Sequence, residues 1–173
     1  MTGKVALALS LHAEEFHAAH GMTLHRGVRV SSIDRQAQTV HSAEGALQYT
    51  TLILATGSTP FVPPVPGNTG TAGLVYRNLE DLDLIRAAAQ GAQHGTVIGG
   101  GLLGLEAANA LRILGLHTSV IQLGGHLMSA QLDKEGGDAL KCRIEALGID
   151  VRTSHATKQI VPGQTCRHRL IFA

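Results

Sequence analysis

Aromatic residues are scarce in this chain, which has no tryptophan, three phenylalanines and two tyrosines among 173 residues. Its core must therefore consist of leucine, isoleucine, valine and alanine, and the hydrophobic fraction of 44% supplies enough of them to exclude a disordered chain. No apolar run approaches the ~20 residues of a membrane helix, so we expect no membrane partner. A net charge of +1 without a basic patch argues against a nucleic-acid partner.

Cysteine is equally rare. Cys142 and Cys166 form no CxxC pair, and two cysteines cannot ligate a four-cysteine iron–sulfur cluster. We interpret them as free thiols in a reducing compartment, which predicts a cytoplasmic protein. Among the ten histidines, His17 and His20 have a usable spacing for a metal, but no third ligand is nearby and solvated histidines are favoured. We therefore expect no metal site.

Proline is absent from most of the chain and concentrated in one segment. Four of the five prolines lie between residues 60 and 66, and a glycine-rich stretch follows at 67–73. Neither a helix nor a central strand can pass through such a segment. The glycines at 67, 70 and 73 also have a spacing of three, but no strand precedes them, which favours a linker. The composition predicts two domains, 1–70 and 71–173.

The most informative stretch is TVIGGGLLGLE at 96–106, a G-x-G-x-x-G pattern between an apolar run and a helical pattern. Gly99 permits the tight turn, Gly101 lets phosphates approach the backbone, and Gly104 lets the helix pack against the strand. Unpaired amides and the helix dipole make the helix N-terminus an anion site. The predicted NAD contacts of the turn are Gly99, Gly100, Gly101, Leu102, Leu103 and Gly104.

Gln122 ends the strand that is expected after this helix, where an acid bonds the adenosine ribose in many NAD sites. Glutamine can bond a ribose but does not repel a 2′-phosphate. No arginine or lysine between Ser119 and Ala130 is available to bind that phosphate. These residues favour NAD over NADP and make Gln122 a candidate NAD contact. The alternative is that Gln122 merely caps its strand.

The first 60 residues predict a helix over 8–20 and then a three-stranded antiparallel meander of short, β-branched segments between 23 and 49. Val30, Ile33 and Leu47 are among its expected inward positions. The continuous apolar run Thr51–Ala55 is typical of a strand that is buried on both faces.

The remaining residues predict an α/β fold with a Rossmann-like βαβ unit. Asn78 and Asp133 are expected N-caps. We expect helices over 79–89, 102–114 and 133–147, strands at 97–98, 117–123 and 149–152, and a hairpin from 159–161 and 169–172.

Four segments carry a resemblance. ILATGSTPFVPPVPG (53–67), VYRNLEDLDLI (75–85), TVIGGGLLGLEAANAL (96–111) and LMSAQLDKEGG (127–137) resemble, in order and spacing, the flavin/pyridine-nucleotide reductase part of the large subunit of NAD(P)H-dependent nitrite reductases. The resemblance covers about residues 10–160. The ATG and GxGxxG blocks are shared by the whole superfamily of flavoproteins with two dinucleotide-binding domains. The stretches GGGLLGLEAA, PFVPP and LMSAQLD narrow the resemblance to nitrite reductases and the related rubredoxin- and ferredoxin-reductase-like enzymes.

The resemblance implies two cofactors, FAD and NAD(P)H, and makes the first domain part of an FAD-binding domain. It places Ala55, Thr56 and Gly57 over the FAD and the backbone of Val30 at the FAD adenine. Glu106 matches an acid near the nicotinamide side of the site. Its alternative is a first-turn carboxylate that is stabilised by the helix dipole.

The chain also departs from the pattern. It has Gln122 where the family has an acid, and Gly124–His126 where the family has an Ala-Pro-containing turn. A first GxGxxG, a late Gly-Asp motif and the cysteines for an iron–sulfur cluster and sirohaem are absent, so we expect an internal fragment of a longer enzyme.

Such a parent passes hydride from NAD(P)H to FAD and then electrons to nitrite, with a homodimer or a small subunit as partner. Two alternatives stay open: a rubredoxin- or ferredoxin-reductase-like flavoprotein, and a non-catalytic nucleotide-binding module.

Overall fold

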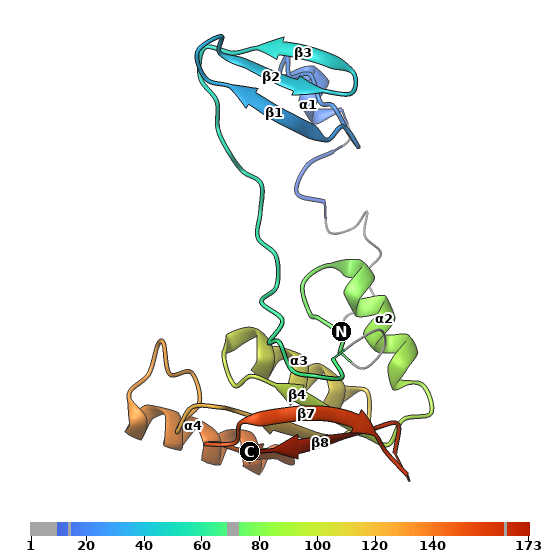
Figure 1. The fold of residues 1–173 in the computed structure, drawn as a ribbon, viewed down its shortest axis with the longest axis vertical. Helices are drawn as coiled ribbons and strands as arrows, with labels where there is room; N and C mark the ends of the chain where they lie inside the picture. The colour runs from blue at the N-terminus through green and yellow to red at the C-terminus, as the bar shows by residue number, and fades with distance from the viewer. Residues whose placement is uncertain (1–9, 14, 69–72, 165) are drawn as a thin grey trace. The chain divides into compact units, whose positions relative to one another are not determined.

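A computed structural model describes residues 10–13, 15–68, 73–164 and 166–173. The chain divides into two compact units, Gly3–Thr59 and Pro60–Ala173. Both contain helices and strands, and the second contains a parallel sheet, which confirms the predicted α/β class (Figure 1). The predicted limits of the ligand-binding domains, 1–70 and 71–173, stay a prediction.

The first unit is an antiparallel meander with one short helix. Its strands pair in the order β1-β2-β3, as expected from the sequence. The helix expected over 8–20 is much shorter in the part of that range that the structure describes. The elements are α1 (Phe16–Ala19), β1 (Val30–Asp34), β2 (Thr39–Ser42) and β3 (Gly45–Gln48).

Two expectations for this unit are wrong. Residues 51–55 form no strand, and the side chains of Ile53 and Leu54 are 83% and 67% exposed. A strand that is buried on both faces needs neighbouring strands, and none of the described strands pairs with this run. Val30, Ile33 and Leu47 are likewise exposed rather than turned into a core.

The second unit is built on a three-stranded parallel sheet in the order β4-β5-β6. The helices between its strands begin and end within a residue or so of the predicted limits. Asn78 and Asp133 are N-caps, as expected, and each accepts a backbone N–H bond on its side chain. The elements are α2 (Leu79–Ala89), β4 (His94–Ile98), α3 (Leu102–Ile113), β5 (His117–Ile121), α4 (Lys134–Ala146) and β6 (Ile149–Arg152).

The core of this unit lies where α3 and the segment after β5 pack on the sheet. Its members are aliphatic, as the shortage of aromatics requires. The small side chain of Ala108 allows α3 to approach the strands closely. The buried cluster consists of Ala108, Val120, Leu127, Ile149 and Val151.

The expected hairpin is also present, as β7 (Thr157–Pro162) and β8 (His168–Phe172). The proline-rich segment is tied to it, because the Ile160 N–H donates to the Pro66 carbonyl at 2.9 Å. Gly67 has φ +84°, and a Cβ there would overlap the Ile160 carbonyl oxygen. Within the described residues, no helix has the length and apolar character to cross a membrane.

Candidate dinucleotide-binding site

The glycine turn joins the carboxyl end of β4 to the N-terminus of α3. Gly99, with φ +116°, begins it, and its N–H donates to the Ile121 carbonyl of the neighbouring β5 at 2.8 Å. This left-handed conformation is one that glycine adopts without strain. Gly101 is the N-cap of α3 and has no side chain that could cap the helix. The amides of the first helical turn therefore have no intrahelical acceptor and face outward as donors.

The glycines of the turn have different surroundings. A Cβ on Gly104 would lie 2.0 Å from the Gly99 carbonyl oxygen, so a side chain there would push α3 off the turn. A Cβ on Gly100 would lie 2.5 Å from a methyl group of Leu127. Gly101 has no heavy atom within 4 Å of its Cβ position. Two glycines therefore serve packing, and the third faces open space at the positive end of a helix.

The side chains of Leu102 and Leu103 follow on the first turn of α3 and are 59% and 54% exposed. They contribute an apolar rim beside the free amides. Anions bind at such helix ends through backbone N–H groups and the helix dipole, which needs no charged side chain. The turn is therefore chemically suited to a pyrophosphate, although Leu102 and Leu103 as NAD contacts stay predictions.

Gln122 follows directly on β5 and turns its half-buried side chain toward the glycine turn. Its Oε1 accepts the Gly100 N–H at 2.8 Å, and its Nε2 donates to the His126 carbonyl at 3.4 Å. The sequence placed Gln122 at the correct strand end. It did not indicate that both ends of the amide contact the protein.

A cavity of about 310 Å³ lies beside the first turns of α3 and α2. Glu106 is exposed to solvent and borders this cavity, and its role near the nicotinamide stays a prediction. The alternative of a first-turn carboxylate is wrong, because α3 begins at Leu102 and has no acidic residue in its first turn. The sequence did not predict that the start of α2 and the residues before it line a cavity. The short extended segment before the Asn78 N-cap was a signal for structure at this place. The lining residues are Tyr76, Arg77, Asn78, Leu79, Leu82, Leu103 and Glu106.

The α2 side of the cavity is fixed by a capping box. Asn78 Oδ1 accepts the Asp81 N–H at 2.8 Å, and Asp81 Oδ2 accepts the Asn78 N–H at 3.0 Å. The Arg77 N–H donates to the same carboxylate oxygen at 3.0 Å. These bonds hold the backbone of the cavity wall in one conformation.

The segment after Gln122 packs against the N-terminus of α4. A Cβ on the buried Gly137 would lie 2.7 Å from the Leu127 carbonyl oxygen and 2.8 Å from the His126 Cβ. Glycine in a first helical turn weakens a helix, and here it allows the helix to approach this segment. The Met128 N–H returns to the turn and donates to the Gly100 carbonyl at 2.9 Å.

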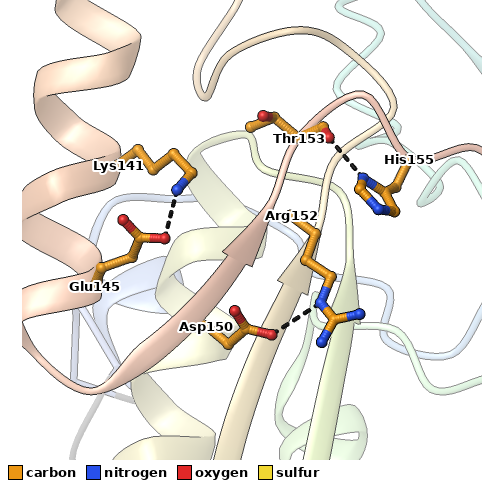
Figure 2. Close-up of polar contacts among 6 residues, drawn as sticks. All are labelled: Lys141, Glu145, Asp150, Arg152, Thr153 and His155. Carbon is orange, nitrogen blue, oxygen red and sulfur yellow. Dashed lines mark hydrogen bonds and ion pairs between the residues drawn. The ribbon is translucent and has the colours of Figure 1, made fainter.

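Several charged pairs lie on α4 and β6. Figure 2 shows Lys141 with Glu145, Asp150 with Arg152, and the His155 ring on the Thr153 carbonyl. The hydrogen bond to Glu145 raises the pKa of Lys141, and a hydrogen bond from Lys134 lowers the pKa of Asp138. All these pairs connect groups within four residues of each other.

The four predicted flavin contacts lie in the Gly3–Thr59 unit. Val30 is on β1 with its side chain 51% exposed. Ala55, Thr56 and Gly57 lie in an exposed segment that is neither helix nor strand, with Gly57 at φ +73°. Their contact with FAD stays a prediction. Among the described residues, no three His, Cys, Asp or Glu side chains are grouped as metal ligands.

Comparisons with known proteins identify relatives of this chain. The nitrite reductase [NAD(P)H] large subunit of Klebsiella oxytoca is 51% identical over 160 residues, which are 92% of this chain and 17% of that protein. The nitrite reductase (NADH) large subunit of Escherichia coli is 44% identical over 95% of this chain and 20% of its own length. The chain thus spans about a fifth of these curated relatives.

A solved ferredoxin reductase from Rhodopseudomonas palustris superposes with a TM-score of 0.85 at 26% identity, over 99% of this chain and 43% of that one. The pyridine nucleotide-disulphide oxidoreductase family matches residues 3–171. Relatives, fold and glycine turn agree with one another, and the chain belongs to the pyridine nucleotide-disulphide oxidoreductase family.

Proposed function

We propose that this chain binds a nicotinamide dinucleotide across the glycine turn, as the nucleotide-binding part of a flavoprotein oxidoreductase. One observation carries the proposal: the open space in front of Gly101 coincides with the uncapped N-terminus of α3. A packing requirement alone explains Gly104 and Gly100, but it does not explain a glycine with nothing near its Cβ position. Close approach of a phosphate to the backbone does explain it.

The proposed pose follows from the elements around the turn. The pyrophosphate lies over the amides of Gly101, Leu102 and Leu103. The nicotinamide end lies at the cavity that Glu106 borders, and the adenosine end lies toward the end of β5. NADH is the favoured form, because residues 119–130 contain no lysine or arginine that could bind a 2′-phosphate.

The bound cofactors would supply the redox chemistry, by hydride transfer from NAD(P)H to FAD. The residues of this chain bind and orient the dinucleotide, and Val30 with Ala55, Thr56 and Gly57 would form one wall of the flavin site. No residue is assigned as a general acid or base.

The names of the most similar relatives support nitrite as the electron acceptor of the parent protein. In such a parent, the iron–sulfur cluster and sirohaem lie outside this chain, the location is cytoplasmic, and a homodimer or a small subunit is the partner. The superposed ferredoxin reductase supports a second candidate, a flavoprotein that donates electrons to a ferredoxin or rubredoxin. A non-catalytic nucleotide-binding module is the third.

The test is Gly101→Val, assayed by titration of the full chain with NADH. Because a branched side chain would fill the phosphate position, we expect about a 10- to 100-fold loss of affinity. The melting temperature should change little, since no atom lies within 4 Å of the new Cβ. Gly91→Asn is the matched control: this glycine ends α2, and asparagine tolerates its φ of +72°.

Unchanged NADH affinity in Gly101→Val would remove the turn from the nucleotide site. A flavin absorption spectrum of the purified chain separates the remaining candidates. Bound flavin that NADH bleaches supports a reductase. A colourless chain that still binds NADH supports the non-catalytic module.

A further inference from the structure

We propose that Gln122 is a positioning residue that fixes the peptide of Gly100, and that this role takes the place of a contact with the adenosine ribose. The inference rests on the proposed function, because its consequence is nucleotide affinity. From the sequence alone, Gln122 is either a ribose ligand or a strand cap.

The Gly100 N–H requires an acceptor. Gly100 is buried, and a buried amide without a partner loses its hydrogen bond to water without replacement. Gln122 Oε1 supplies that acceptor at 2.8 Å. The Met128 N–H binds the carbonyl of the same residue at 2.9 Å. Gly100 is therefore held through both of its backbone polar groups at the centre of the turn.

Gln122 is itself held from both sides by the backbone. Its N–H donates to the Arg152 carbonyl at 2.8 Å, and its carbonyl accepts the His155 N–H at 3.0 Å. The first bond joins the end of β5 to the end of β6, and the second joins it to the segment after β6. The side chain therefore starts from a fixed backbone, which leaves little conformational freedom to lose when it reaches Gly100.

An amide fits this place better than a carboxylate. One end must accept from Gly100, and the other end faces the His126 carbonyl oxygen, which only a donor can approach. Nε2 also needs room, because a Cβ on Gly124 would lie 3.0 Å from it. Glutamine satisfies both contacts, whereas glutamate would bring a carboxylate oxygen toward the His126 carbonyl.

The contact divides the turn amides into two groups. Gly99 and Gly100 donate inside the protein, so Gly101 and the first turn of α3 are left for a ligand. Loss of the Gln122 contact would loosen the backbone just before those donors. The pyrophosphate is common to NADH and NADPH, so both nucleotides should lose affinity by the same factor. A ribose ligand would behave differently, because the two nucleotides differ at the 2′ position.

The experiment compares Gln122→Leu, Gln122→Glu and the control Gln159→Leu, which changes an exposed glutamine on β7. The full chain is titrated with NADH and with NADPH, and amide exchange at Gly100 is followed by NMR. For Gln122→Leu we expect about a 3- to 10-fold loss with each nucleotide, at an unchanged NADH-to-NADPH ratio, and faster exchange at Gly100. Gln122→Glu keeps an acceptor for the Gly100 N–H but loses the donor to the His126 carbonyl, so its protection of Gly100 should lie between those of Gln122→Leu and the unmodified chain. The control should match the unmodified chain in every readout.

Two results would overturn the proposal. One is a change of the NADH-to-NADPH ratio in Gln122→Leu with unchanged exchange at Gly100, which would make Gln122 a ribose ligand. The other is unchanged exchange at Gly100 together with unchanged affinity for both nucleotides. If the unmodified chain binds neither nucleotide, the proposed function fails, while the exchange at Gly100 still decides whether Gln122 holds the turn.

Discussion

Apolar segments of similar composition are buried in one unit of this chain and exposed in the other. In the Pro60–Ala173 unit, apolar strand residues such as Val120 and Val151 are buried in a core with α3. In the Gly3–Thr59 unit, the apolar run 51–55 forms no strand, and Ile53 is 83% exposed. The composition of both segments is typical of buried strands. The difference shows that such a run becomes a buried strand only where neighbouring strands and a covering helix are available.

The difference in burial implies a difference in stability between the two units. Buried aliphatic side chains stabilise a fold in proportion to the area they remove from water, and exposed ones contribute little. The second unit therefore contains the larger part of the stability of the chain. The first unit has hydrogen-bonded strands, but its large apolar side chains leave much of their surface in water.

The largest expected effect comes from comparing Leu127→Ala with Ile53→Ala. Leu127 has no exposed surface and belongs to the core cluster, so its truncation should cost about 2–5 kcal/mol of unfolding free energy. Ile53 is exposed, so its truncation should stay within about 0.5 kcal/mol. Equilibrium urea unfolding, followed by circular dichroism, measures both.

If Ile53→Ala were as destabilised as Leu127→Ala, the contrast between an exposed run in the first unit and a buried core in the second would be contradicted. It would mean that the 51–55 run is covered in solution. Leu54→Ala is the matched second variant, because Leu54 is exposed beside Ile53 and should also be neutral.

A smaller effect is expected inside the glycine turn. Gly104→Ala places a Cβ against the Gly99 carbonyl oxygen and should cost roughly 1–3 kcal/mol, as crowded contacts do. Gly101→Ala places a Cβ in open space and should leave the melting temperature nearly unchanged. Thermal unfolding of the two variants checks this. Equal destabilisation would mean that the turn is packed by something on the Gly101 side.

The sequence predicted the second unit well because its signals are local. The Asn78 and Asp133 N-caps, the strand at 149–152 and the helix after Gly101 follow from residues within a few positions of each element. The failure at 51–55 is non-local, because the pairing of a strand depends on partners elsewhere in the fold.

In the candidate site, too, the local features were predictable and the long-range contacts were not. The turn and its place between β4 and α3 could be read from the glycine spacing. The Gln122–Gly100 contact could not be read in this way, because it joins residues 22 positions apart. The packing role of Gly137 could not be predicted either, since only the folded structure brings the 126–127 segment against α4.

The smallest expected effect concerns an ion pair on the surface of α4, between Lys141 and Glu145. The hydrogen bond to Glu145 raises the pKa of Lys141 above its usual 10.5, so the pair stabilises the fold at neutral pH. This contribution is complete below the unfolded pKa of the lysine and is lost as the pH rises through the higher folded value. An (i, i+4) pair of this kind is worth about 0.2–0.5 kcal/mol and weakens with salt.

A double-mutant cycle of Lys141→Met and Glu145→Gln isolates this term from the loss of each side chain alone. Its coupling free energy should be constant from pH 6 to pH 9, shrink above about pH 10.5 as the lysine loses its proton, and fall in 1 M salt. Coupling as large as the Leu127→Ala effect would contradict the contrast between buried and exposed contributions. Coupling that grows above pH 10.5 would contradict the sign of the pKa shift, because only the charged lysine is stabilised by Glu145.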